Sequence, residues 1–131
     1  MKSILLVDDE AAICVELQRT LQELGYHVEV AHTFELALGS INETRFDAIL
    51  VEFNLTSECG ANPRTGGGIR LIRDLRDSGT TIPILVYTVM EGKTYKAASL
   101  DAGADDFILK QIPISDFFSR LREHIMMREE T

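Results

Sequence analysis

Residues 4–9 read Ile-Leu-Leu-Val-Asp-Asp, an apolar strand that runs directly into two carboxylates. The same arrangement returns in residues 48–52 (Ala-Ile-Leu-Val-Glu), 84–88 (Ile-Leu-Val-Tyr-Thr) and 107–110 (Phe-Ile-Leu-Lys). Short apolar runs of this kind are typical of strands buried on both faces of a parallel sheet. Because open α/β sheets bind ligands outside the carboxyl ends of their strands, we expect these polar residues to meet at one edge.

Helical patterns separate the strands. After the first strand, apolar residues recur at spacings of three and four, at Ile13, Leu17, Leu21 and Leu24. Asp9 is suited to cap this helix and Gly25 to end it in a left-handed turn. The remaining pattern predicts helices over residues 33–42, 69–78, 93–102 and 114–128, and a short alternating strand over residues 27–30.

Five strands alternating with five helices predict an α/β fold with a parallel sheet covered by helices on both faces. With right-handed crossovers, the best topology is the flavodoxin-like, doubly wound sheet of order 2-1-3-4-5. That order places the strands that carry Asp8 and Glu52 side by side. At 131 residues, the chain is predicted to be a single domain over residues 1–131.

The composition excludes several classes of protein. A formal net charge of −8 and the lack of a basic stripe argue against nucleic-acid binding. No apolar stretch approaches the ~20 residues of a membrane span and no signal peptide opens the chain, so we expect a cytoplasmic protein without membrane contact. Two cysteines are too few for a disulfide framework or a zinc site.

The residues at the four strand ends form a chemically coherent set: Asp8, Asp9, Glu52, Thr88 and Lys110. Clustered carboxylates suit a hard cation such as Mg²⁺, which neutralises them and keeps several waters. A lysine opposite them supplies a point charge for a phosphoryl group, and a threonine hydroxyl can donate to a phosphoryl oxygen. Each residue alone has an ordinary explanation as a helix cap or surface charge; their joint placement indicates a site.

Other motifs in the sequence give weaker evidence about function. The glycine run at residues 66–68 lacks the Gly-Lys-Ser/Thr of a phosphate loop, and loop flexibility explains it more simply. His27, His32 and His124 lie on separate elements without ligand spacing. A flavin-binding protein of this topology would want a Ser/Thr-rich loop where Asp8, Asp9 and Glu10 stand, so we do not expect the chain to be an enzyme.

The chain resembles the receiver domain of bacterial two-component response regulators, of the chemotaxis-regulator type. Four motifs carry this resemblance over essentially the whole chain: Val7–Glu10, Phe46–Val51, Val86–Thr88 and Ala102–Lys110. The resemblance implies a module that accepts a phosphoryl group on an aspartate from a histidine kinase or phosphotransfer protein. It would pass the signal to an output protein, or to a second copy, through the face built from helix 93–102, strand 106–109 and the last helix.

The resemblance also assigns roles to single residues. Asp8, Asp9, the side chain at position 52 and the backbone carbonyl of Asn54 would hold Mg²⁺. Thr88 would be the switch hydroxyl and Lys110 the phosphoryl-binding lysine. Phe107 falls where the family keeps an aromatic residue that turns inward on activation.

Glu52 departs from the family because it stands where the phosphoacceptor aspartate belongs. Its extra methylene moves the carboxylate by ~1.5 Å, about one C–C bond. Phosphoryl transfer depends on positioning, so we predict that Glu52 is not phosphorylated at a useful rate and that Mg²⁺ binding is weakened. Phospho-mimicry should be partial, because one negative charge replaces the ~1.5–2 charges of a phosphate.

These departures leave two hypotheses open. The first is a phosphorelay receiver in which Glu52, natural or engineered, locks an otherwise working switch. The second is a degenerate receiver that acts as a phosphorylation-independent interaction module. Val89, beside Thr88, and the long loop 53–68 favour the second, because an engineered change at position 52 would not explain them. This loop borders the site and could serve as a lid or a docking segment.

Overall fold

The computed structural model describes residues 1–55 and 67–129. Five parallel strands form one sheet: β1 (Ser3–Val7), β2 (His27–Ala31), β3 (Ala48–Val51), β4 (Ile84–Thr88) and β5 (Asp106–Leu109). Their order is β2-β1-β3-β4-β5, which confirms the predicted topology. Strands β3 and β4 are buried along their whole length, as their continuous apolar sequences require.

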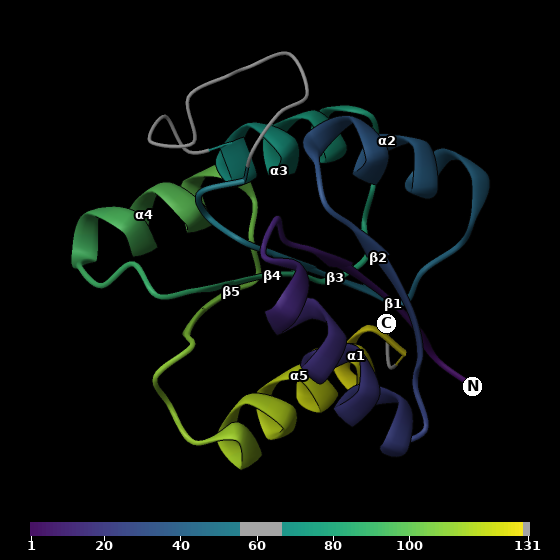
Figure 1. Ribbon diagram of the computed structural model, residues 1–131. Coiled ribbons are helices and arrows are strands. Elements are labelled where there is room, and N and C mark those ends of the chain that lie inside the picture. Colours follow the sequence, from purple (N-terminus) through teal and green to yellow (C-terminus); the bar gives the residue numbers. More distant parts are fainter. Residues whose placement is uncertain (56–66, 130–131) are drawn as a thin grey trace.

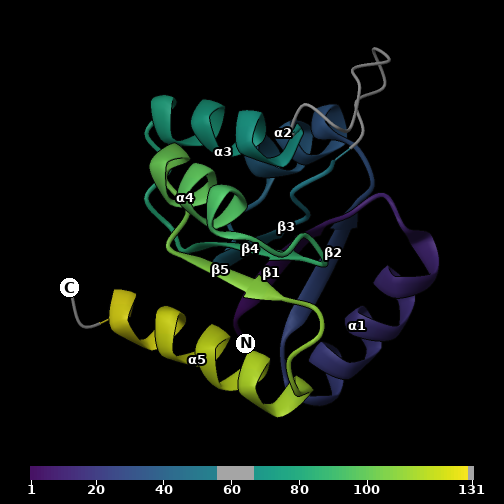
Figure 2. The same cartoon turned by 90° about the vertical axis from the view of Figure 1, so that its left-hand side faces the viewer.

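Helices cover both faces of the sheet (Figures 1 and 2). They are α1 (Ala11–Glu23), α2 (Phe34–Glu43), α3 (Gly67–Asp77), α4 (Lys93–Ala102) and α5 (Ile114–Glu129). Helices α2, α3 and α4 lie on one face, and α1 and α5 on the other. The buried apolar residues accordingly form two clusters, one on each side of the sheet. No helix in the described ranges is long and apolar enough to cross a membrane.

The strand register aligns the polar strand ends. Val7 of β1 pairs with Val51 of β3, and Val51 in turn pairs with Val86 of β4. Thr88, the last residue of β4, pairs with Leu109 of β5. The residues after these paired positions therefore leave the sheet next to one another.

The residues that cap the helices agree only in part with those predicted from the sequence. Thr33 caps α2, since its Oγ1 accepts a hydrogen bond from the backbone N of Leu36 at 3.2 Å. Gly25 follows α1 with φ +98°, which glycine adopts without strain. The prediction that Asp9 caps α1 is wrong. The N-cap is Glu10, and its side chain makes no capping hydrogen bond.

Two glycines of the run 66–68 are needed for close packing. Helix α3 begins at Gly67, and a Cβ on that residue would lie 2.0 Å from the carbonyl oxygen of Leu55. A Cβ on Gly68 would lie 2.2 Å from the carbonyl oxygen of Glu52. Backbone contact, and not the predicted loop flexibility, explains these two residues. The rest of the predicted loop, residues 56–66, lies outside the described part of the chain.

Candidate functional site

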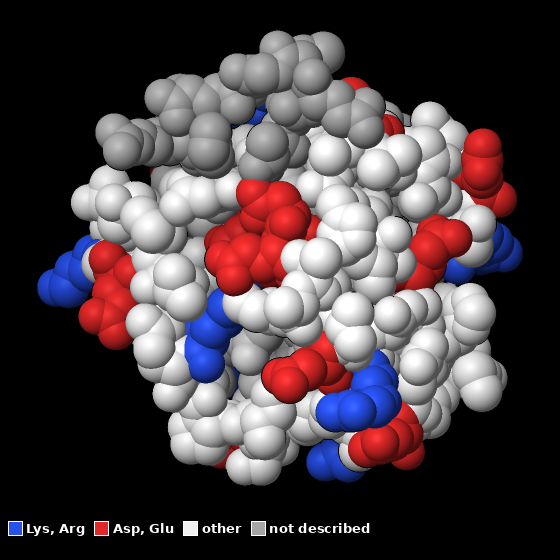
Figure 3. Space-filling model, in the orientation of Figure 1, with Lys and Arg blue, Asp and Glu red and all other residues white. Residues whose placement is uncertain are grey.

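Two buried carboxylates stand side by side at the carboxyl edge of the sheet. Asp8 and Glu52 directly follow the paired residues Val7 and Val51, and the N–H of Glu52 donates to the Val7 carbonyl at 2.9 Å. Asp8 is only 3% exposed and Glu52 7%. Figure 3 shows further acidic side chains gathered near the middle of this face, where β1 passes into α1. Carboxylates this deeply buried require a cation.

Lys110 supplies that cation. Its Nζ donates to Oδ2 of Asp8 at 2.7 Å and to Oε1 of Glu52 at 3.1 Å. The lysine side chain is itself only 10% exposed. Burial alone would lower the pKa of Lys110, but the hydrogen bond to Asp8 and the charges of Glu52 and Asp8 outweigh burial and raise it. The ammonium therefore stays charged between two carboxylates.

One oxygen of this cluster has no partner. Oε2 of Glu52 is buried and accepts no hydrogen bond from any described residue. A buried acceptor left unpaired costs about 1–3 kcal/mol, and more when it carries charge. The site thus offers one unsatisfied, negatively charged oxygen beside a fixed ammonium.

Asp8 makes further contacts, through its backbone and its side chain, that the sequence did not predict. Its carbonyl oxygen lies 3.0 Å from Nδ1 of His32 and 3.5 Å from Sγ of Cys14. Its Oδ1 accepts a hydrogen bond from the N–H of Glu10 at 3.0 Å. Cys14 is buried, and burial together with the charge of Asp8 raises its pKa to about 11. His32 could have been found from its position, because it directly follows β2 at the same sheet edge.

Thr88 and Phe107 are buried near this cluster without joining it. The Oγ1 of Thr88 accepts a hydrogen bond from the N–H of Met90 at 3.2 Å. Its link to Lys110 runs through the backbone, where Lys110 N donates to the Thr88 carbonyl at 2.8 Å. Phe107 points inward and belongs to the apolar cluster on the side of α2, α3 and α4.

The predicted metal set is brought together only in part. Asp8 and Glu52 converge on Lys110, whereas Asp9 is exposed and Asn54 is half-buried. Within residues 1–55 and 67–129, no three His, Cys, Asp or Glu side chains are grouped closely enough to hold a metal ion by themselves. The structure therefore shows an Asp–Lys–Glu cluster at the sheet edge.

Comparison with known proteins identifies the family. Residues 4–122 match the family model described as response regulator receiver domain. The chain belongs to this receiver family. It is 37% identical over 119 residues to the response regulator MprA of Mycobacterium avium (strain 104), which covers 91% of this chain and 49% of that protein. MprA of Mycobacterium tuberculosis (strain H37Rv) matches at 37% with 48% covered. The receiver thus spans about half the length of these curated relatives.

Solved receiver structures share its fold. The BeF3-activated N-terminal receiver domain of Klebsiella pneumoniae RstA superposes with a TM-score of 0.85 at 27% identity, covering 95% of this chain and 98% of that one. A CheY-like receiver domain protein from Methanospirillum hungatei JF-1 gives 0.86 at 26% identity, covering 99% and 98%. Family and fold together establish a receiver module of two-component signalling, as the sequence motifs indicated.

Proposed function

We propose that Glu52 holds this receiver in a state that does not accept a phosphoryl group at a useful rate. The observation that carries the proposal is the position of the Glu52 carboxylate, which is buried and hydrogen-bonded to Lys110 at 3.1 Å. A phosphoryl acceptor must reach the phosphorus of its donor in line. A carboxylate carried outward by one methylene and paired with the ammonium is poorly placed for that attack.

The same contact gives Glu52 part of the effect of a phosphoryl group. In the proposed state its carboxylate accepts a hydrogen bond from the ammonium of Lys110. Without that contact the ammonium would be available to bind phosphoryl oxygens. The Glu52 carboxylate brings one negative charge in place of the ~1.5–2 charges of a phosphate. Thr88 has no hydrogen bond to this carboxylate, so the switch hydroxyl is not drawn in. We therefore infer partial mimicry.

Mg²⁺ fits the oxygen chemistry of the site. The unpartnered, buried Oε2 of Glu52 favours an added cation, and Asp8, Asp9, Glu52 and the carbonyl of Asn54 would hold it. Bound there, Mg²⁺ would neutralise carboxylates and orient phosphoryl oxygens. Since no three described side chains form a ready cage, waters would complete its shell. Lys110 already pairs with two of the carboxylates, and its single positive charge offsets part of their negative charge, so we expect weak binding.

We further propose that partners use the face formed by α4, β5 and α5. A cavity of about 380 Å³ on this face is lined by apolar and basic residues. The apolar lining residues are Phe107, Leu109 and Ile112, and the basic ones are Lys93, Lys96 and Arg120. An output protein or a second copy would dock there, while a histidine kinase or phosphotransfer protein would approach the carboxyl edge of the sheet.

A second candidate is an interaction module that works without phosphorylation. It is favoured by the Asp8–Lys110–Glu52 cluster, in which both carboxylates are paired with the ammonium of Lys110. In this case partner binding alone would set the state of the module.

Intact mass measurement tests the proposal. The chain and its Glu52→Asp variant are incubated with Mg²⁺ and acetyl phosphate, with EDTA-treated samples as controls. We expect only the Asp variant to gain one phosphoryl mass, and only with Mg²⁺, which would show Glu52 to be a lock on working machinery. If neither chain gains mass, the interaction module is the better description. Phosphorylation of Glu52 itself would overturn the proposal.

A further inference from the structure

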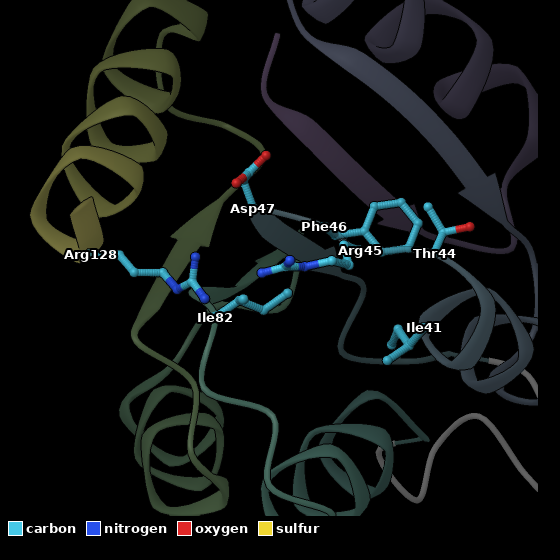
Figure 4. Close-up of a pocket in the computed structure, with 7 residues that line it drawn as sticks. All are labelled: Ile41, Thr44, Arg45, Phe46, Asp47, Ile82 and Arg128. Atoms are coloured by element: carbon cyan, nitrogen blue, oxygen red, sulfur yellow. The ribbon is translucent and has the colours of Figure 1, made fainter. Parts of the chain in front are cut away.

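A second hollow lies at the opposite edge of the sheet, where β3 and β4 begin. Its volume is about 270 Å³. Its walls come from the end of α2, the turn into β3, the residue Ile82 before β4 and the last turn of α5 (Figure 4). The Asp8–Lys110–Glu52 cluster stands at the other end of the strands, so a ligand bound in this hollow would not contact Glu52.

Two guanidinium groups converge on this cavity. Arg45, from the turn into β3, and Arg128, from α5, point toward each other beside Ile82 (Figure 4). Arg45 forms no hydrogen bond or ion pair with any residue in the described part of the chain. The acid in the lining, Asp47, turns away from both groups, and its Oδ2 accepts a hydrogen bond from the N–H of Ser3 at 2.8 Å.

Two neighbouring positive charges are unexpected in so acidic a chain. The formal net charge is −8, so the pairing of two arginines here does not follow from an excess of basic residues in the chain. An anion placed between two guanidinium groups is attracted by both of them. The planar guanidinium group matches phosphate and carboxylate oxygens in a two-pronged geometry.

The rest of the lining is apolar. Phe46 is buried, and Ile41 and Ile82 are half-buried beside it. The hydroxyl of Thr44 adds one neutral polar group. A ligand that satisfies the whole cavity therefore needs a compact apolar body as well as an anionic group, and a bare ion would leave the apolar wall uncovered.

We propose that this cavity binds a small organic anion, a phosphate monoester or carboxylate whose charged group lies between Arg45 and Arg128 and whose apolar body packs on Phe46 and Ile82. Nothing in the sequence pattern indicated it, because its two arginines are far apart in the chain and meet only in the folded molecule.

Phenyl phosphate is a suitable probe, because it joins a phosphate monoester to a flat apolar ring. We expect its titration, followed by amide NMR spectra in chloride buffer, to give saturable shifts at Phe46, Ile82 and Arg128. Arg45→Gln and Arg128→Gln should each weaken binding about fivefold or more, the loss of one charge-assisted hydrogen bond. Arg19→Gln, an exposed substitution on α1 with the same charge change, should leave affinity within about twofold.

Inorganic phosphate is the matched ligand without the apolar body, and it should bind more weakly than phenyl phosphate. The proposal is overturned if the parent chain shows no saturable shift, or if the two cavity variants, with spectra still dispersed, bind as tightly as the parent. It is also overturned if Arg19→Gln weakens binding as much as the two cavity variants, or if the shifts map to Asp8 and Lys110. Binding to phosphatidic acid vesicles without any response to phenyl phosphate would assign the basic groups to a lipid surface and likewise overturn it.

Discussion

At the scale of single residues, Lys110 decides whether two buried carboxylates are tolerated. Desolvating three charged groups is costly, and their mutual attraction repays that cost only with good geometry. The geometry here is good, because the ammonium of Lys110 lies 2.7 Å from Asp8 and 3.1 Å from Glu52. A receiver with glutamate at this position is thus compatible with a stable fold because the longer side chain still reaches the lysine.

Lys110→Met should lower the free energy of unfolding by about 3–5 kcal/mol, because it leaves Asp8 and Glu52 buried without a cation. Urea denaturation at neutral pH measures the change. Lys96→Met, an exposed lysine on α4, is the matched control and should shift stability by no more than about 0.5 kcal/mol.

Adding Glu52→Gln to the Lys110→Met variant should recover part of the loss, since one of the two uncompensated charges is then removed. Equal losses in Lys110→Met and Lys96→Met would show that the ion pairs do not stabilise the fold.

At the scale of elements, the start of α3 is fixed to the strand that carries Glu52. The N–H of Gly68 donates to the Phe53 carbonyl at 3.0 Å, and the missing side chain lets the helix lie against the backbone of Glu52. The position of Glu52 therefore depends on how closely α3 approaches.

Gly68→Ala should destabilise the protein by about 1–3 kcal/mol, because its Cβ would lie 2.2 Å from the Glu52 carbonyl and force two backbone segments apart. Gly39→Ala is the control: it lies inside α2 with nothing within 4 Å of the added Cβ. That substitution should stabilise the helix by roughly 0.5–1 kcal/mol. Thermal denaturation compares the two variants, and a shift of the same sign in both would contradict this account.

The elements could be predicted from the sequence because their signals are local. Continuous apolar strands, helical spacing and Thr33 as a cap need only neighbouring residues, and polar strand ends then place Asp8 and Glu52 at one edge. Contacts set by the folded register could not be obtained in this way. These contacts join segments that are separated in the chain. Examples are the hydrogen bonds of Lys110 to Asp8 and Glu52, the contact of His32 with the Asp8 carbonyl and the packing of Gly68 on Glu52.

At the scale of the whole molecule, Asp106 joins the sheet to the helical layer of α5. Its carboxylate accepts hydrogen bonds from Arg120 and from the N–H of Phe107, and its Oδ2 lies 2.9 Å from Nε2 of His124. Burial alone would raise the pKa of Asp106, but the hydrogen bonds to Arg120 and His124 outweigh it and hold the pKa below its ordinary value of 3.8.

A lowered pKa in the folded state means that Asp106 stabilises the fold above its ordinary pKa and loses this effect as the pH falls through the folded value. Asp106→Asn should therefore lower the free energy of unfolding by about 1–3 kcal/mol at pH 7. The difference in the free energy of unfolding between the parent chain and this variant should shrink steadily as the pH falls below the ordinary pKa of the carboxyl. There Asp106 takes up a proton and becomes neutral, as asparagine is at every pH. Urea denaturation from neutral to acidic pH measures this difference.

The net charge of −8 calls for a control, because removing any carboxylate relieves self-repulsion in so acidic a molecule. Asp77→Asn makes the same charge change at an exposed position at the end of α3. The difference between the two variants then isolates the contacts of Asp106 from the field of the whole chain. A difference that stays constant across the acidic range would mean that Asp106 acts through packing and not through its charge.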